Sequence, residues 1–258
     1  MRVGASTLYG LYLKPSEAVR RLAEKNFRFI EVIFEHPHFL TRADVAALRK
    51  IKRDHALSFS MHCPFMTMQL GHKDAAVRRA TRALLRRSLR AASALEATHY
   101  VLHGGRMQHV YASFGGDETE IFREFVGEVA PFVREAQHDG VRVVFENCLG
   151  HDFFARAENL FRAARACGAG FCLDIAHAEL TRQKQALAKR VPDYVHATDT
   201  LLEQRDDLHL GIGDGSIDYE WWLRVLRRLE FDGSIILECA HEAAFQPSRE
   251  KLLRMWKA

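Results

Sequence analysis

The sequence has few of the features that mark a secreted, membrane-bound or disordered protein. Its 258 residues include five cysteines and six prolines, and no two cysteines form a CxxC pair. An odd cysteine count without framework spacing argues against a disulfide scaffold, so the cysteines are expected to be small buried residues in a reducing compartment. No segment approaches the roughly 18 uncharged apolar residues that span a membrane, and the first residues lack the layout of a signal peptide. We therefore expect a cytoplasmic protein without a membrane partner.

The charge balance is only slightly basic. Lysine and arginine number 37 against 33 acidic residues, a formal net charge of +4. This excess suits a phosphate-bearing substrate without requiring one. Part of it falls on one face of a single helical segment, which we interpret as the solvated side of an amphipathic helix: Arg78, Arg79, Arg82, Arg86, Arg87 and Arg90.

One unit recurs along the chain: a short apolar run, a polar loop and a segment with helical spacing of its apolar residues. This alternation is typical of parallel βαβ units. The predicted strands are Val3–Ser6, Phe29–Phe34, Leu57–His62, Tyr100–His103, Val141–Glu146, Gly170–Asp174, Tyr194–Ala197 and Ser234–Glu238.

Helical spacing of apolar residues fills the intervals between these strands. The predicted helices are Ser16–Lys25, Arg42–His55, Ala75–Leu95, Glu118–His138, Ala157–Ala166, Ala178–Lys189, Tyr219–Leu229 and Pro247–Trp256. Eight alternating pairs in a chain of this length predict an α/β protein with one domain, a single (β/α)8 TIM barrel over residues 1–258.

Charged or imidazole side chains close nearly every predicted strand or follow it directly. A buried strand end tolerates such a group only when a partner offsets a cost of several kcal/mol. The carboxyl ends of barrel strands also form the face that carries active sites. Imidazole and carboxylate groups are ligands of zinc and similar cations. The sequence therefore predicts two or three divalent ions, zinc first and Mn²⁺ or Fe²⁺ as alternatives, with these ligands: His62, His103, Glu146, Asp174, His177, His196, Asp207, His209 and Glu238.

Two of the spacings have their own logic. Asp174 ends a strand and His177 lies in the first turn after it, so the two can serve neighbouring ions. Asp207 and His209 alternate in an extended segment, so they can point the same way and share an ion. The glycines of the following GIGDG segment would let the loop fold tightly over the mouth of the barrel.

Several short motifs resemble the xylose isomerase-like barrel superfamily, and within it the endonuclease IV family of apurinic/apyrimidinic (AP) endonucleases (family 2). All nine positions that match the ligands of that family hold the expected residue type, while Phe65 stands where the family usually has tyrosine. The motifs are MHCPF (61–65), QLGH (69–72), HGG (103–105), EN (146–147), LDIAHA (173–178), HATD (196–199), DLHLGIGDG (207–215) and ILE (236–238).

The resemblance implies a zinc-dependent phosphodiester hydrolase that cleaves DNA at abasic sites. It implies that His62, His103 and Glu146 bind one ion, and that Glu146 bridges to a second ion. Asp174, His196 and Glu238 would hold that second ion. The remaining ligands, His177, Asp207 and His209, would hold a third. Metal ions in such a site activate water and neutralise charge on the attacking and departing oxygens.

The alternative is a metal-dependent sugar or sugar-phosphate isomerase or epimerase of the same superfamily. Such enzymes resemble this chain at a single-ion set, Glu146, Asp174, His196 and Glu238. There the catalytic carboxylates Glu146 and Glu238 could shuttle a proton at a carbon next to a carbonyl. The five extra ligands favour the hydrolase over this alternative. A binding-only barrel is a third hypothesis, which an intact ligand set disfavours.

Other polar and aromatic residues have weaker signals. Glu31 is expected to be structural, and for Glu35 a substrate contact and a solvated salt bridge are equally consistent with the sequence. The loop histidines receive no role: His36, His38, His109, His151 and His241. Tyr219, Trp221 and Trp222 are expected in the core.

Overall fold

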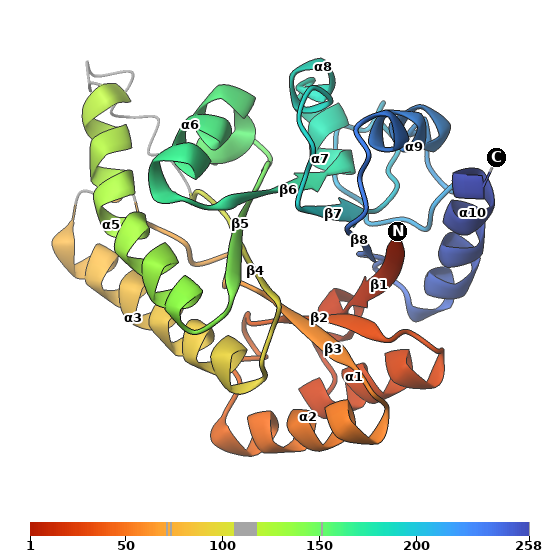
Figure 1. The fold of residues 1–258 in the computed structure, drawn as a ribbon, viewed down its shortest axis with the longest axis horizontal. Helices are drawn as coiled ribbons and strands as arrows, with labels where there is room; N and C mark the ends of the chain where they lie inside the picture. The colour runs from red at the N-terminus through yellow and green to blue at the C-terminus, as the bar shows by residue number, and fades with distance from the viewer. Residues whose placement is uncertain (71, 73, 106–117, 151, 258) are drawn as a thin grey trace.

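The eight predicted strands close into a barrel (Figure 1). The computed structural model describes residues 1–70, 72, 74–105, 118–150 and 152–257. Neighbouring strands pair in parallel around the ring, and β1 pairs with β8 to close it. The strands are β1 (Arg2–Ser6), β2 (Phe29–Ile33), β3 (Ser58–His62), β4 (His99–Leu102), β5 (Arg142–Glu146), β6 (Gly170–Asp174), β7 (Tyr194–Ala197) and β8 (Ser234–Leu237).

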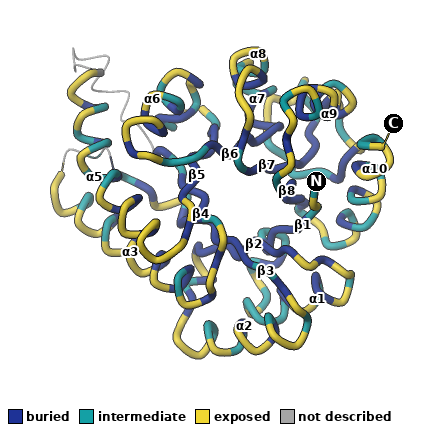
Figure 2. Tube along the Cα trace, viewed as in Figure 1, coloured by how far each residue is buried: buried dark blue, intermediate teal, exposed yellow. Residues whose placement is uncertain are grey.

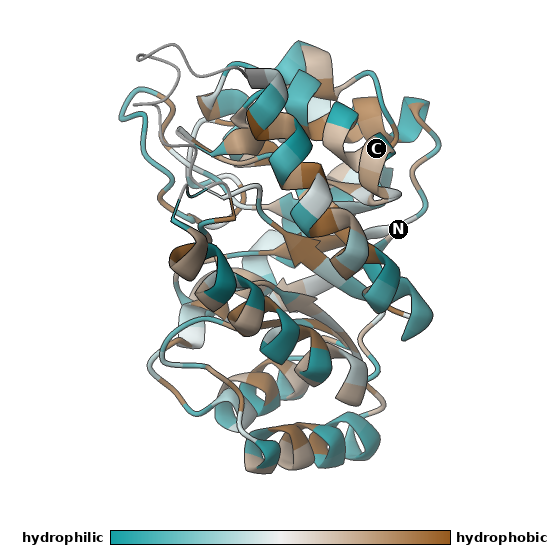
Figure 3. Cartoon of the chain, turned by 90° about the vertical axis from the view of Figure 1, so that its left-hand side faces the viewer, coloured by the Kyte–Doolittle hydropathy of each residue, from teal (hydrophilic) through white to brown (hydrophobic). Residues whose placement is uncertain are grey.

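Helices surround the barrel and cover its outer face (Figures 1 and 3). Thr41 and Asp44 form a capping box at the start of α2, and the Asp218 carboxylate caps α9 by accepting from the Trp221 N–H. The longer helices are α1 (Pro15–Glu24), α2 (Arg42–Asp54), α3 (Ala75–Ala94), α5 (Glu118–His138), α6 (Ala157–Cys167), α9 (Tyr219–Arg228) and α10 (Phe245–Lys257).

The prediction of a (β/α)8 barrel is confirmed, and each strand boundary lies within one residue of its predicted position. The single helix predicted at Ala178–Lys189 is wrong. Two short helices take its place, α7 (Ile175–Leu180) and α8 (Lys184–Leu187). The Asp174 carboxylate accepts a hydrogen bond from the His177 N–H and so starts α7 directly after β6. Arg182 then adopts a positive φ of 58° and separates the two helices.

The inside of the barrel holds a small apolar layer that is distinct from the larger core between strands and helices. One inward-facing residue from each of six strands forms it: Phe29, Val101, Val144, Cys172, Tyr194 and Ile236. Because side chains alternate along a strand, the residue two positions further on faces inward as well, one level closer to the carboxyl ends. The layer therefore lies beneath the inward-facing residues at the carboxyl ends of the strands. The strands of the barrel are buried, and exposed residues lie along the surrounding helices (Figure 2).

The arginine face of α3 is only partly the solvated surface that its pattern predicts. Arg78 and Arg82 pair with Glu128 of α5, and Arg86 lies 3.7 Å from Glu135. The Arg87 guanidinium lies over the Phe34 ring, 5.6 Å from its centroid. This face therefore serves contacts between helices, and none of these arginines is among the described residues that line the pocket.

Five free cysteines agree with the prediction that the chain has no disulfide framework. All five are buried. Tyr219 and Trp222 are likewise buried in the core, as expected, whereas Trp221 is only partly buried and packs against the core from outside. Every helix in the described ranges is too short or too polar to cross a lipid bilayer.

His99 at the base of β4 predicts a loss of stability in mild acid. Burial, followed by the charge of Arg142, lowers the pKa of His99 from 6.5 to about 4. The unfolded chain binds a proton near pH 6.5, while the folded chain does so only near pH 4. Stability should therefore fall as the pH drops through this window, by up to about 3 kcal/mol. Urea unfolding of wild type and His99→Gln at pH 7 and pH 4.5 measures this.

In that comparison, the wild type should lose more stability than His99→Gln between the two pH values. The difference between the two proteins matters, because other groups titrate equally in both. Equal losses in wild type and variant would show that His99 does not carry the effect.

Candidate metal centre

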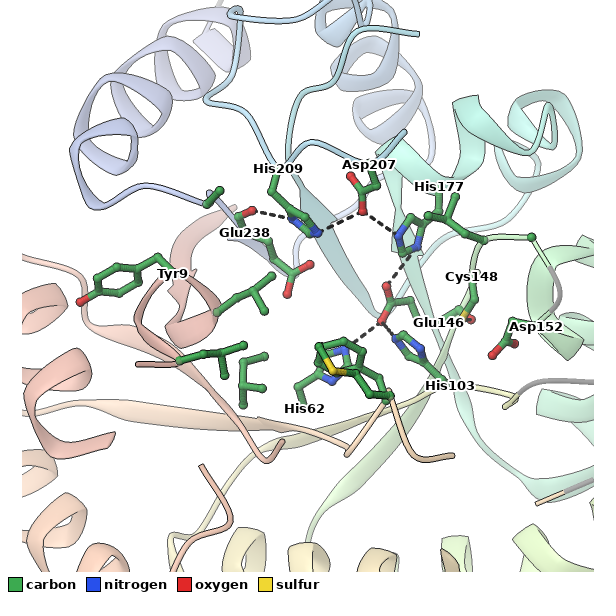
Figure 4. Close-up of a pocket in the computed structure, with 18 of the residues that line it drawn as sticks. Tyr9, His62, His103, Glu146, Cys148, Asp152, His177, Asp207, His209 and Glu238 are labelled. Atoms are coloured by element: carbon green, nitrogen blue, oxygen red, sulfur yellow. Dashed lines mark hydrogen bonds and ion pairs between the residues drawn. The ribbon is translucent and has the colours of Figure 1, made fainter. Parts of the chain in front are cut away.

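The structure brings all nine predicted ligand residues together at the carboxyl end of the barrel. Figure 4 shows those of them that line the pocket. His62, Glu146 and Asp174 are the last residues of β3, β5 and β6, and His196 lies within β7. His103 and Glu238 directly follow β4 and β8, and His177 lies in the first turn of α7. Asp207 and His209 come from the loop between β7 and α9. Seven of the nine line one pocket, while Asp174 and His196 are fully buried beneath it.

Glu146 is the centre of the cluster, with an imidazole pair on each carboxylate oxygen. His62 Nε2 and His103 Nε2 lie 3.3 and 3.0 Å from Oε2. His177 Nδ1 and His196 Nδ1 each lie 3.4 Å from Oε1. His196 Nδ1 also lies 3.5 Å from Glu238 Oε2, so this imidazole stands between the two glutamates. Glu146 thus contacts four imidazoles, two through each carboxylate oxygen.

Asp207 organises the outer part of the cluster. Its Oδ2 lies 3.1 Å from His177 Nε2 and 3.0 Å from His209 Nε2. The loop that carries Asp207 and His209 is anchored by Asp199, whose carboxylate accepts the N–H groups of Thr200, Gly213 and Ile217. Gly215 is required there, because a Cβ would come within 2.3 Å of Asp199 Oδ1. The prediction that the glycines allow tight folding of this loop is thereby confirmed.

Backbone carbonyls orient three of the imidazoles. The Nδ1 atoms of His62, His177 and His209 lie 2.9, 2.9 and 2.8 Å from the carbonyl oxygens of Cys63, Asn147 and Glu238. Since a carbonyl only accepts, Nδ1 carries the proton and each neutral ring has a lone pair on Nε2. That lone pair faces a carboxylate oxygen. Two acceptors at this distance repel unless a cation lies between them, and a proton or a metal ion can fill this role.

The raised pKa values of the imidazoles also indicate that the cluster favours a bound cation. Burial alone would lower the pKa of His209, but the hydrogen bond to Asp207 and the charges of Asp207, Glu238 and Asp174 together outweigh burial and raise the pKa to about 9. In His62, burial also lowers the pKa, and the contacts with Cys63 and Glu146 raise it well above the usual value. The cluster therefore holds protons firmly in the absence of metal, and metal ions must displace them to bind.

The two glutamates have opposite pKa shifts. Burial would raise the pKa of Glu146, but His196 and His103 outweigh it and hold the pKa well below the usual value. Burial dominates at Glu238 and raises its pKa to about 7, against the opposing charge of His196. The Glu146 carboxylate is thus kept ionised, whereas the Glu238 carboxylate changes its protonation state near neutral pH.

The donor atoms fit a divalent cation. Three buried ligand atoms have no hydrogen-bond partner, namely Asp174 Oδ2, His196 Nδ1 and Asp207 Oδ1. Unsatisfied polar atoms of this kind are costly unless something binds them. Among the sets whose donor atoms lie within 4.8 Å of one another, three consist only of predicted ligands: His62–His103–Glu146, His62–His196–Glu238 and Glu146–Asp174–His177. Nitrogen and oxygen donors in such sets suit zinc, and manganese or iron as well.

The sets match the predicted grouping in part. The predicted trio His62, His103 and Glu146 occurs as such. Asp174 groups with Glu146 and His177, whereas the resemblance implied that it shares an ion with His196 and Glu238. His177, Asp207 and His209 contact one another through Asp207, in the combination that the resemblance implied.

The pocket above the cluster has a volume of about 980 Å³. This lies at the upper end of the range for pockets that hold small organic ligands, roughly 300–1,000 Å³. None of the described lining residues is a lysine or an arginine. Apolar and aromatic side chains form the upper wall: Leu8, Tyr9, Leu11, Tyr12, Ile33, Phe65, Met66 and Leu149.

Glu35 is neither a substrate contact nor a solvated salt bridge, the two roles that the sequence left open. Its side chain is buried and accepts hydrogen bonds from the N–H groups of His36 and Met66, so it ties the loop after β2 to the loop after β3. His38 is also buried, with Nε2 2.6 Å from the Leu13 carbonyl oxygen. His36 and His241 are exposed, and His109 and His151 lie outside the described residues.

Sequence reasoning missed three residues near the ligands. Glu31, expected to be structural, lies 3.2 Å from His196 Nε2. Cys148 and Asp152 line the pocket and form a further donor set with His103. Glu31 left a signal, since it is the only charged residue in the apolar strand FIEVI. Cys148 and Asp152 left none, because a loop position does not reveal its direction.

Fold and cluster together define a class of protein, a (β/α)8 barrel whose carboxyl-terminal mouth carries clustered histidine and carboxylate groups that could hold a divalent metal. The chain belongs to the xylose isomerase-like TIM barrel family, whose model matches residues 19–257. The predicted superfamily is thereby confirmed.

Known proteins similar to this chain include one curated relative. The uncharacterized protein MJ1311 of Methanocaldococcus jannaschii is 24% identical over 253 residues, which cover 92% of this chain and 83% of that protein.

Several solved structures share the fold. A D-tagatose 3-epimerase-like protein has a TM-score of 0.88 at 22% identity, covering 100% of this chain and 97% of its own. The TTHB071 protein from Thermus thermophilus, soaked with ZnCl2, has a TM-score of 0.76 at 25% identity, covering 99% of this chain and 98% of its own. D-psicose 3-epimerase in the presence of D-fructose has a TM-score of 0.72 at 19% identity, covering 93% of this chain and 85% of its own.

Proposed function

We propose that the protein is a metal-dependent epimerase or isomerase of a small, unphosphorylated sugar. The similar structures include D-psicose 3-epimerase and a D-tagatose 3-epimerase-like protein, and psicose and tagatose are both ketoses. This similarity favours the alternative hypothesis over DNA repair. The lining of the pocket supports the same choice. A phosphate group needs cationic or N–H partners, and the described lining offers no lysine or arginine.

The observation that carries the proposal is the placement of Glu146 and Glu238. They come from β5 and β8, three strands apart around the ring, and both line the pocket. His196 lies between them, 3.4 Å from Glu146 and 3.5 Å from Glu238. A small substrate held between the two carboxylates would present one face to each of them.

Two carboxylates on opposite faces provide what epimerisation needs. One accepts the proton from the carbon next to the carbonyl, and the electron pair of the broken C–H bond enters the π system of the resulting enediolate. The other carboxylate, in its acid form, returns a proton to the opposite face of the same carbon. The configuration inverts, and no other reactant is needed. The apolar upper wall would exclude water from the intermediate.

The set of residues that would hold the catalytic ion is Glu146, Asp174, His196 and Glu238. When bound, a divalent ion there would supply Lewis acidity, which stabilises negative charge on a substrate oxygen.

Exchange of a substrate proton with solvent tests the proposal. Ketopentoses and ketohexoses are incubated in D₂O with protein loaded with Zn²⁺, Mn²⁺ or Co²⁺, and NMR follows loss of the proton next to the carbonyl and formation of the epimer. We expect exchange with at least one sugar, and a loss on the order of 10²-fold or more in Glu238→Gln. Glu242→Gln is the matched control, because Glu242 pairs with Arg21 and Lys25 away from the pocket. Metal-loaded protein without exchange on any sugar would contradict the proposal.

A second candidate is phosphodiester hydrolysis, favoured by one specific observation. Five further ligand residues, His62, His103, His177, Asp207 and His209, join the four that a one-ion epimerase needs. The descriptions of the similar structures named above do not mention DNA. Cleavage of a duplex with one abasic site, by protein that holds three ions per chain and exchanges no sugar proton, would assign the hydrolase.

A further inference from the structure

We propose that Glu31 is a positioning residue that fixes His196 as a metal ligand. Glu31 Oε2 lies 3.2 Å from His196 Nε2, and both side chains are 0% exposed. The inference concerns metal binding alone, so it holds for a sugar epimerase and for a hydrolase alike.

The strand register places Glu31 in the same layer as the ligands. It follows Phe29 of the apolar layer by two positions, as Glu146 follows Val144, Asp174 follows Cys172 and His196 follows Tyr194. Alternation of side chains along a strand therefore gives Glu31 the depth and the inward direction of a ligand. β2 therefore contributes a carboxylate, Glu31, at the level of the predicted ligands. This carboxylate contacts the outer nitrogen of one of them, the His196 imidazole.

A chain of hydrogen bonds holds Glu31 in place. The Tyr194 hydroxyl donates to Glu31 Oε2 at 3.1 Å and lies 2.5 Å from Ser60 Oγ. Because the ionised carboxylate only accepts, the second donor to Oε2 is the Nε2–H of His196. His196 Nδ1 is then left with a lone pair, directed at Glu146 and Glu238 and without a hydrogen-bond partner.

His196 differs in this from the other imidazoles of the cluster. His62, His177 and His209 donate from Nδ1 to backbone carbonyls and present Nε2 to a carboxylate of the cluster, whereas His196 presents Nδ1. No backbone carbonyl among the described contacts orients its ring. A carboxylate that accepts from a metal-bound imidazole fixes the tautomer and the ring orientation and increases the basicity of the ligand. Glu31 would supply all three effects.

Metal affinity of the whole chain tests this role. Wild type, Glu31→Gln and Glu35→Gln are stripped of metal and titrated with Zn²⁺ against a chromophoric chelator. Glu35 is the matched control, because it is another buried glutamate next to β2 but accepts only from backbone N–H groups. We expect at least one dissociation constant of Glu31→Gln to rise by about 10- to 100-fold. Those of Glu35→Gln should stay within about threefold of wild type, even where its thermal midpoint falls.

An NMR signature separates positioning from general support of the fold. In zinc-loaded wild type and Glu35→Gln, the His196 Nε2–H proton should exchange slowly and resonate far downfield, as expected for a charge-assisted hydrogen bond. In Glu31→Gln it should move upfield. Unchanged zinc affinity in Glu31→Gln, or an equal loss in Glu35→Gln, would overturn the proposal.

Tyr194→Phe provides the test if Glu31→Gln does not fold. It removes the hydroxyl that donates to Glu31 and keeps the ring. Tyr100→Phe is its control, since the buried Tyr100 hydroxyl contacts Ser88 outside the ligand network. Zinc should bind more weakly to Tyr194→Phe and with unchanged affinity to Tyr100→Phe. Equal affinities in these two variants would also overturn the proposal.

Discussion

Glu146→Gln should lower turnover by about 10³-fold or more while the barrel stays folded. Glutamine has the size of glutamate, so the packing around β5 is retained. The amide cannot accept a proton and is a poor metal ligand, and its NH₂ group would face imidazoles now placed around a carboxylate. Steady-state kinetics on the substrate identified by proton exchange, metal content per chain and circular dichroism measure the three effects.

The matched control for this variant is Glu179→Gln. Glu179 lies two residues after His177 but contacts Trp222 Nε1 and Lys184. Its variant should keep turnover within about threefold of wild type, since it touches no predicted ligand. Full activity of a folded Glu146→Gln would remove Glu146 from the mechanism, whichever reaction the protein catalyses.

Removal of metal should lower the thermal midpoint by about 10 °C and abolish activity. A ligand that binds only the folded state stabilises it by about 4 kcal/mol at a thousandfold excess over its dissociation constant. In a chain of this size, 1 kcal/mol corresponds to about 2–4 °C. Differential scanning fluorimetry with and without a strong chelator, followed by Zn²⁺ or Mn²⁺ in excess, measures the loss and its reversal.

Glu146→Gln also serves as the control for chelation. It lacks the central carboxylate of the cluster, so the chelator should shift its midpoint far less than that of wild type. A midpoint of wild type that is the same with chelator and with excess metal would contradict the view that this cluster binds ions in the folded protein.

Much of the fold and of the candidate site could be predicted because both depend on strand periodicity. A parallel barrel strand is an apolar run whose end lies at the mouth, so a histidine or carboxylate at that end is directed to a common place. His62, Glu146 and Asp174 satisfy this rule directly, and the structure brings them together. The sequence places His177 near the other predicted ligands even though it predicts the wrong start for the following helix. The prediction depends on the three-residue spacing from Asp174 and not on the helix boundary.

The residues that escaped prediction depend on contacts across the barrel. Glu31 and His196 are 165 positions apart, and no local pattern links them. The role of Glu35 depends on how the loops after β2 and β3 meet, since its partner Met66 is 31 positions away. The arginines of α3 looked solvated because the spacing within one helix does not show that α5 supplies Glu128 and Glu135.

The substrate class could not be predicted from the ligand pattern, because it depends on the residues that form the wall of the pocket. Nine ligands favoured several ions and hence phosphodiester chemistry. The described wall, however, is apolar and aromatic without lysine or arginine, and it belongs mainly to loops whose directions are set by tertiary packing. The identity of the metal likewise depends on availability in the cell as well as on the donor atoms.

The predicted ligands lie on or directly after the six strands from β3 to β8, and Glu31, which contacts His196, lies on β2. Only β1 carries none of these residues. The last predicted ligand, Glu238, directly follows β8, so the complete set of nine cannot form until that strand has joined the barrel. A barrel that closed without β8 would therefore lack one of the two carboxylates of the proposed acid–base pair.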